Sequence, residues 1–334
     1  MISEQPAINL RPMSVGEMLD RAFTVYFKNI LVLTAALIVV LVPMLVLNYL
    51  GQRDLLGFDL SMITDAMKNP NKPPPPPDIN QLMGAYVTSL PYIGLSMLLA
   101  IFALPFANSA IIAGISRSYL GQRVRFIDCY RDALARWPHI LLLAVLWIVA
   151  FIAAYLTFVF IMLIFVLAGG AIGSHAPPAV AITVAILLIP LGIWCIILAL
   201  QVYLAWALSF AAVTIEHADP VHAFGSGFSR VFGGGSYWRS AGVAAAIAGI
   251  VLVFELITAA AIGALFFWLK MPVESVPLAF SGFGGVVTAI ITPVSFAIVA
   301  MYYYDVRIRR EGFDLDHLTR LLSISEPSQP TSTA

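Results

Sequence analysis

The residue best suited to chemistry is an acidic one, Glu255, which lies in the apolar stretch VLVFELITA. An ionisable side chain inside a bilayer costs about 2.5–3.5 kcal/mol, and such residues often belong to ion or substrate pathways. Gln201 and Asn108 lie in two other apolar stretches and are candidate partners for it. Three interpretations are open: a neutral carboxyl that is hydrogen-bonded between helices, a coupling or substrate site, or a residue near the membrane interface.

A second group of polar residues ends the last apolar stretch, in the sequence MYYYDVRIRREGF. Tyrosines followed by arginines are typical of the membrane–water interface, where the rings lie among headgroups and basic side chains face anionic lipid. The pattern therefore predicts an aromatic belt at Tyr302–Tyr304, with Arg307 and its neighbours at the inner leaflet. The alternative hypothesis is a binding site formed by Tyr304, Asp305 and Arg307.

The sequence lacks the motifs of the common enzyme classes. Its five histidines form no His-Glu-x-x-His pair, and its two cysteines, Cys129 and Cys195, form no Cys-x-x-Cys pair. The glycine-rich stretch GSGFSRVFGGGS lacks the Gly-Lys-Ser/Thr of a phosphate-binding loop, and no predicted strand precedes it. We therefore predict no catalytic residue, no metal site, no cofactor and no enzymatic activity.

The composition indicates the environment in which these residues must be positioned. The 334 residues are 60% hydrophobic and 11% charged, whereas a soluble domain is about 25% charged. A single water-soluble core cannot bury so many apolar side chains, so the solvent must be lipid. The net charge of zero gives no support for a nucleic-acid partner. The predicted fold class is an all-α, polytopic membrane helix bundle.

Six stretches are apolar and long enough to cross a hydrocarbon layer of about 30 Å, which takes about 20 helical residues. They are 30–50, 92–115, 140–172, 179–215, 241–269 and 283–303. Fourteen of the 18 Lys and Arg residues fall on the side of the two termini. The basic side is normally cytoplasmic, so we predict a multi-pass protein of a bacterial plasma membrane with both termini in the cytoplasm.

Three short amphipathic segments precede the pairs of spans, in 14–29, 125–137 and 219–232. They predict a pseudo-threefold repeat of one short helix and two spans. Each short helix should lie at the inner interface, with its apolar face either on lipid or on the bundle. Their basic residues are expected to contact the anionic inner leaflet; they include Arg21, Lys28, Arg131 and Arg136.

The remaining features concern loops and kinks. We predict a single membrane domain over 1–322, an external loop over 51–90 with a polyproline spacer at 73–77, and a disordered cytoplasmic tail over 323–334. Prolines within the spans should kink them, either for packing or around a transport site. These prolines are Pro43, Pro105, Pro190 and Pro293.

Three stretches resemble a known family. They are RPMSVGEMLDRAFTVYFKN, TIEHADPVHAFGSGFSRVFGGGSYWRSAG and YYYDVRIRREGFDL, and they are similar to bacterial membrane proteins related to the membrane domain of glycerophosphoryl diester phosphodiesterases. In the two-part members of that family, catalysis belongs to a separate soluble barrel with metal-binding carboxylates. This chain has no room for the barrel and none of its motifs, so the resemblance implies a membrane fold and no activity.

Two functions follow as hypotheses. The first is a non-enzymatic membrane anchor or scaffold that organises partner proteins at the cytoplasmic face. It rests on the three basic amphipathic helices and on the missing catalytic motifs. The alternative is a small transporter or channel that uses Glu255 and the proline-kinked spans.

Overall fold

The computed structural model describes residues 11–68, 79–173, 178–233, 235–270 and 276–312. All regular structure in these residues is helical, which confirms the predicted all-α class. In chain order the helices are α1 (Val15–Lys28), α2 (Ile30–Lys68), α3 (Ile79–Tyr119), α4 (Phe126–Ala135), α5 (Trp137–Gly173), α6 (Pro178–Ala211), the π-helix η1 (Ala212–Glu216), α7 (Pro220–Phe232), α8 (Tyr237–Leu269) and α9 (Val276–Glu311).

Six of the described helices are long and apolar enough to cross a membrane, which confirms the predicted number of spans. The candidate spans are Ile30–Gly51, Ile79–Tyr119, Trp137–Phe160, Gly192–Glu216, Tyr237–Leu269 and Gly282–Arg310. The element order also reproduces the predicted repeat, because a short helix (α1, α4 or α7) precedes each pair of long ones.

The short helices begin where their sequences predict. In α1, the Ser14 hydroxyl accepts a hydrogen bond from the Glu17 backbone N–H at 3.2 Å, as expected at an N-cap. In α7, the Asp219 carboxylate accepts one from the Val221 N–H at 3.2 Å, and Pro220 occupies the first helical position. Local sequence therefore determines where these helices start.

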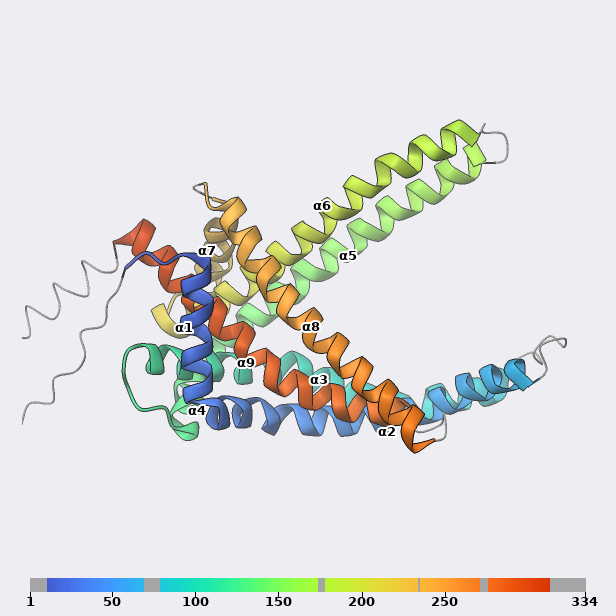
Figure 1. Cartoon of the computed structure of the whole chain (residues 1–334), viewed down its shortest axis with the longest axis horizontal. Coiled ribbons are helices and arrows are strands. Elements are labelled where there is room, and N and C mark those ends of the chain that lie inside the picture. The colour runs from blue at the N-terminus through green and yellow to red at the C-terminus, as the bar shows by residue number, and fades with distance from the viewer. Residues whose placement is uncertain (1–10, 69–78, 174–177, 234, 271–275, 313–334) are drawn as a thin grey trace, which may run out of the picture.

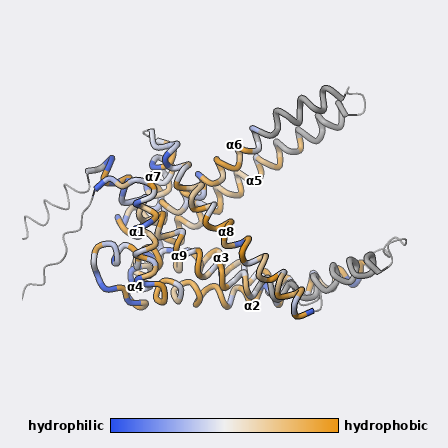
Figure 2. Tube along the Cα trace, viewed as in Figure 1, coloured by the Kyte–Doolittle hydropathy of each residue, from blue (hydrophilic) through white to orange (hydrophobic). Residues whose placement is uncertain are grey.

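The helices meet at one end of the molecule and diverge towards the other. Figure 1 shows α1, α4, α7 and the C-terminal turns of α9 together at the left, whereas α5 and α6 extend to the upper right and α2 and α3 to the right. Figure 2 shows most hydrophilic residues at that same left-hand end. We call this end, formed by α1, α4, α7, η1 and residues 302–311 of α9, the polar end.

The main core lies at the polar end around α9. Helix α9 contacts α1, α2, α3, α6 and α8, and its side chains are buried from Val294 to Val306. In contrast, α5 and α8 expose large apolar side chains along much of their described length. This distribution is expected of a membrane protein, because lipid is as good a solvent for leucine as a protein core is.

One prediction about the spans needs correction. Residues 51–68 and 79–90, expected in an external loop, are helical, because α2 and α3 continue beyond the expected ends of their spans. Pro43, Pro105, Pro190 and Pro293 lie inside helices, as expected, and the kinks at these prolines stay a prediction. The polyproline 73–77 and the tail 323–334 lie outside the described residues.

Candidate functional site

The prediction of an aromatic belt at Tyr302–Tyr304 is wrong. All three side chains are fully buried within the protein. The belt argument assumes a helix end that faces lipid, whereas α9 packs against five other helices. The Tyr304 hydroxyl lies 2.6 Å from the Ser116 hydroxyl, and the Tyr304 and Tyr119 ring centroids are 4.8 Å apart. Tyr304 therefore joins α9 to α3 inside the core.

Asp305 is the centre of a buried ion-pair cluster. Its carboxylate is fully buried and accepts a hydrogen bond of 2.7 Å from the backbone N–H of Met13. The Arg239 guanidinium lies 2.8 Å from the Asp305 carboxylate, and the Arg309 guanidinium lies 3.1 Å from it. One carboxylate thus connects the segment before α1, the start of α8 and the end of α9.

Glu216, the last residue of η1, centres a second cluster. Its carboxylate pairs with Arg230 of α7 at 2.7 Å and with Arg307 of α9 at 3.0 Å. The Arg230 guanidinium also stacks over the Tyr303 ring, 4.7 Å from its centroid, in a cation–π contact. This cluster joins the third short helix to the same turns of α9 that the Asp305 cluster holds.

These contacts oppose the hypothesis that Tyr304, Asp305 and Arg307 form an open binding site. Each of the three side chains already has protein partners, and both carboxylate oxygens of Asp305 are occupied. A buried carboxylate needs such partners, because an unpaired charge would cost several kcal/mol. Tyr304 and Asp305 therefore have a structural role, and Arg307 shares it through Glu216.

Glu255 does not meet the partners predicted for it. Gln201 is fully buried, and its amide oxygen accepts a hydrogen bond of 2.7 Å from the Ser240 hydroxyl. Asn108 is buried, and its amide oxygen has no hydrogen-bond partner among the described residues. The Glu255 side chain is exposed on the protein surface and, in the described part of the chain, makes no ion pair or hydrogen bond. The three residues therefore do not form one polar site.

Glu255 instead lines a cavity of about 530 Å³ between α6, α8 and α9. The other lining residues are Leu200, Tyr203, Ala244, Ile247, Ala248, Val251, Leu252, Thr288, Ile291, Thr292 and Ser295. One carboxylate and four hydroxyl groups thus face a mainly apolar space within the span region. This combination suits a cation or an amphiphile with a cationic group more than it suits an anion.

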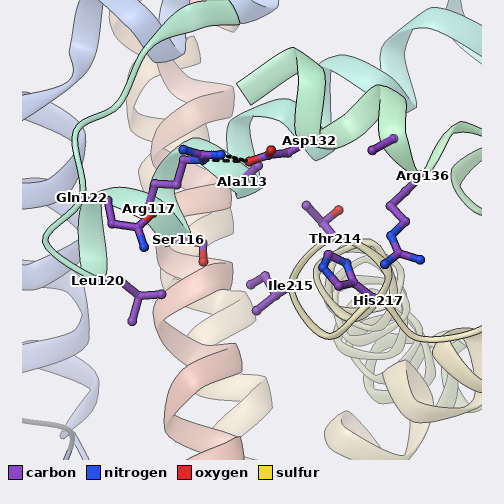
Figure 3. A pocket seen from close by; sticks show the side chains of 11 residues that line it. Ala113, Ser116, Arg117, Leu120, Gln122, Asp132, Arg136, Thr214, Ile215 and His217 are labelled. Carbon is purple, nitrogen blue, oxygen red and sulfur yellow. Dashed lines mark hydrogen bonds and ion pairs between the residues drawn. The ribbon is translucent and has the colours of Figure 1, made fainter. Parts of the chain in front are cut away.

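A second cavity, of about 360 Å³, lies at the polar end between α3, α4 and η1. Figure 3 shows Arg117, Ser116 and Gln122 on one side of it and Arg136, Thr214 and His217 on the other. The Arg117 guanidinium pairs with the Asp132 carboxylate at 2.7 Å. The side chains of Arg136, His217 and Gln122 make no hydrogen bond or ion pair with the described residues. The described lining of this cavity therefore carries net positive charge.

The backbone at His217 is unusual. His217 has φ of 59° and ψ of 31°, the left-handed conformation, directly after the π-helix Ala212–Glu216. Single-turn π-helices and left-handed residues other than glycine are uncommon in proteins. Where they do occur, they are often at functional sites. The chain turns here from the end of the fourth span into α7, and this turn places the imidazole at the cavity.

The basic residues predicted to face anionic lipid have different surroundings. Arg21 pairs with Glu17 at 3.1 Å, and Lys28 is exposed at the end of α1. Arg131 is largely exposed, with its side chain 74% accessible. Arg136 is half-buried and lines the polar-end cavity. Lys28 and Arg131 thus remain available to lipid headgroups.

Helix α4 divides its predicted apolar face between two environments. Phe126 and Tyr130 pack against the core, together with the fully buried Cys129. Large apolar side chains on its other sides are exposed; they are Ile127, Leu134 and, just beyond the helix, Trp137. Burial raises the pKa of the Cys129 thiol to about 11. One side of α4 therefore packs on the bundle and the other is exposed, and contact of the exposed side with lipid stays a prediction.

Among the described residues no group of His, Cys, Asp and Glu could hold a metal ion.

Sequence reasoning did not single out several residues that the structure brings together. The missed residues are Glu216, Arg239 and Arg309 in the ion-pair clusters and Arg117, Asp132 and His217 at the cavity. Local signals existed for His217, which closely precedes the helix start at Asp219, and for Arg309, which lies four residues after Asp305 on α9. The other pairs join different segments of the chain.

Comparisons with known proteins leave the chain without an assigned relative. No family model, no curated protein and no solved structure matches it. The resemblance to the membrane domain of glycerophosphoryl diester phosphodiesterases therefore stays a prediction from three short stretches.

Proposed function

We propose that this chain is a non-enzymatic membrane anchor or scaffold, whose polar end is a rigid platform for partner proteins in the cytoplasm. The observation that carries the proposal is the pair of ion-pair clusters around Asp305 and Glu216. Asp305 and Glu216 together fix the segment before α1, η1, α7, α8 and the end of α9 to one another. A platform built in this way holds its exposed residues in fixed positions.

The orientation is part of the proposal. Arginines and lysines are concentrated at the polar end, and basic residues favour the cytoplasmic side. The membrane is then a bacterial plasma membrane, with α1, α4 and α7 at its inner surface. Cysteine labelling in intact cells tests this arrangement: a cysteine that replaces Pro75 should react with a membrane-impermeant reagent, and one that replaces Ser332 should react only after permeabilisation. The reverse pattern would overturn the orientation.

The surface offered to partners is on α4. Arg131, Ile127 and Leu134 are exposed on it, while Cys129 and Ala133 anchor the helix to the core. A fixed surface with one basic and two large apolar side chains has the composition of many interface centres. Its closeness to the predicted inner leaflet would place partners beside the membrane.

Site-specific crosslinking in native membranes tests the scaffold proposal. A photo-reactive amino acid at Arg131 should give discrete protein adducts. The matched control is the same amino acid at Phe158, an exposed apolar residue on α5 in the span region, which should give lipid adducts or none. Protein adducts that are absent at Arg131, or equal at both positions, would contradict the proposal.

One observation favours transport as a second candidate. Glu255 faces the cavity of about 530 Å³ between α6, α8 and α9, with the hydroxyls of Tyr203, Thr288, Thr292 and Ser295 in the same wall. A carboxylate on a cavity at span depth is a feature of proton and cation carriers. Two of these helices also contain a proline, which removes one backbone donor from each: Pro190 in α6 and Pro293 in α9.

The transport candidate requires a titratable group at position 255. If it is correct, Glu255→Gln should abolish proton or monovalent-cation flux in proteoliposomes, while Glu255→Asp should retain part of it. Both variants should remain folded, because Glu255 has no partner among the described residues. Absence of flux in the unmodified protein, or unchanged flux in Glu255→Gln, would eliminate this candidate.

A further inference from the structure

We propose that the cavity at the polar end, between Arg117, Arg136 and His217, is a binding site for a phosphate group. The proposal goes beyond the scaffold function, because it assigns a ligand rather than a protein partner. The ligand class is a phosphate monoester or inorganic phosphate, which carries about two negative charges and several acceptor oxygens. The source of that group is either a lipid headgroup or a water-soluble phosphate.

Charge is the first argument. Two guanidinium groups, Arg117 and Arg136, face the cavity, and only one carboxylate, Asp132, opposes them among the described lining residues. His217 also lines the cavity, and its imidazole can donate a hydrogen bond from a ring N–H. The C-terminal ends of α3 and η1 contribute only partial negative charges, and the start of α5 at Trp137 contributes a partial positive one. The cavity therefore attracts anions.

Hydrogen-bond donors are the second argument. Arg136, His217 and Gln122 line the cavity, and in the described part of the chain their side chains have no partner. The Thr214 hydroxyl is also unpartnered there. A carboxylate ligand has two oxygens, whereas a phosphate monoester offers three terminal oxygens to several donors. Arginine suits phosphate especially, because its planar group forms two parallel hydrogen bonds.

The third argument is that the fold holds these donors in place. Arg117 lies at the end of α3 and is fixed by Asp132 of α4. Arg136 occupies the short joint between α4 and α5, and His217 has a left-handed backbone after η1. Three separate segments thus contribute to one cavity of about 360 Å³, a size within the usual range for small-ligand sites.

The surroundings favour a lipid as the source. Trp137 follows Arg136 directly, and its side chain is exposed. An exposed tryptophan beside a basic cavity is typical of the headgroup region of a bilayer. A phosphate monoester headgroup, such as that of phosphatidic acid, can then reach the cavity while its acyl chains stay in the membrane.

The test uses the full chain and two sources of phosphate. In detergent, inorganic phosphate is titrated and binding is followed by calorimetry, with acetate as the carboxylate comparison. In nanodiscs of phosphatidylcholine, with or without phosphatidic acid, lipid retained on the protein is measured by native mass spectrometry. Saturable binding in the first arm alone identifies a soluble phosphate, and selective retention in the second identifies a lipid headgroup.

Two variants and one control assign the binding to the cavity. Arg136→Gln removes an unpartnered guanidinium and should weaken binding by about tenfold or more, because hydrogen bonds to charged groups are the strong ones. His217→Asn should also weaken binding, and asparagine tolerates the left-handed backbone. Arg123→Gln removes a charge from the exposed segment between α3 and α4, outside the cavity lining, and should bind as the unmodified protein does.

Three results would overturn the proposal. The first is no saturable binding in either arm. The second is equal loss of binding in Arg136→Gln and Arg123→Gln, which would indicate a general charge effect. The third is acetate binding as tight as phosphate binding. Thermal unfolding of each variant confirms that the loss does not come from misfolding, and the scaffold proposal is judged separately from the crosslinks at Arg131.

Discussion

The polar end and the membrane-spanning halves of the helices are held together in different ways. At the polar end, the buried Asp305 and the partly exposed Glu216 each centre an ion-pair cluster, and tyrosines, short helices and backbone groups pack around them. Along the spans the packing is uneven: 61% of the most apolar window of α9 is buried, against 6% for α8. Helices α8 and α9 form one pair of spans, yet α9 is central in the bundle and α8 faces outward.

This difference has a physical origin. In lipid, apolar side chains gain little by leaving the solvent for a helix–helix contact, so spans associate through close packing and a few polar bonds. At the polar end water is present, and the hydrophobic effect drives burial. Ion pairs between segments then select one arrangement of the short helices. We therefore expect substitutions at the polar end to affect stability more than substitutions on the spans.

The largest effect is expected at Asp305. Asp305→Ala removes the acceptor for the Met13 N–H and the counterion of Arg239 and Arg309. The free energy of unfolding should fall by about 3 kcal/mol, at the low end for a broken buried pair, because both arginines are partly exposed. Denaturant titration in detergent measures it. Asp20→Ala, at an exposed position on α1, is the control, and equal losses in both variants would refute the comparison.

A smaller loss is expected where α7 crosses α6. A Cβ on Gly227 would lie 2.1 Å from the Ser209 hydroxyl oxygen and 2.5 Å from the Ala205 carbonyl oxygen. Gly227→Ala should therefore cost about 1–3 kcal/mol through overpacking. Gly225→Ala lies on the same helix with nothing within 4 Å, and it should be neutral or stabilising, because alanine favours helices. Equal thermal stability of the two variants would show that this crossing is not tight.

The effect of pH tests burial of α4 against the core. Burial raises the pKa of the Cys129 thiol from 9.0 to about 11. The folded protein therefore keeps this proton where the unfolded chain loses it, so the contribution of the thiol to stability is complete below about pH 9 and is lost as the pH rises towards 11. Cys129 should resist alkylation at pH 8 in the folded protein, as measured by mass spectrometry. Rapid labelling at pH 8 without denaturant would contradict it.

The smallest effect is expected on the spans. Glu255→Leu should change the free energy of unfolding by less than about 1 kcal/mol, because Glu255 is exposed to the cavity and has no partner in the described residues. Gln201→Leu is the matched comparison, since it breaks the hydrogen bond with Ser240 and should cost about 0.6–1.7 kcal/mol. A larger loss of unfolding free energy for Glu255→Leu than for Gln201→Leu would contradict this prediction, because it would indicate that Glu255 makes a stabilising contact.

Sequence reasoning predicted the helices correctly, but it did not predict which side chains contact one another. The six spans, the three short helices and the helix starts at Ser14 and Asp219 follow from local composition and capping, and the structure has all of them. Gln201 and Asn108 were predicted as partners of Glu255 because all three are polar residues in apolar stretches. The helix that carries Glu255 is apolar all round, however, so no periodicity indicated which face packs on the protein.

The sequence alone determined that this chain is a helical membrane protein with short amphipathic joints, because length, apolar composition and capping residues act within a few turns. Only the tertiary structure decided that Tyr302–Tyr304 are core residues, that Asp305 joins three distant segments, and that Arg117, Arg136 and His217 share a cavity. These relations join residues up to 292 positions apart. They depend on which helix lies at the centre, and that choice comes from packing and charge pairing between segments rather than from the pattern within any one of them.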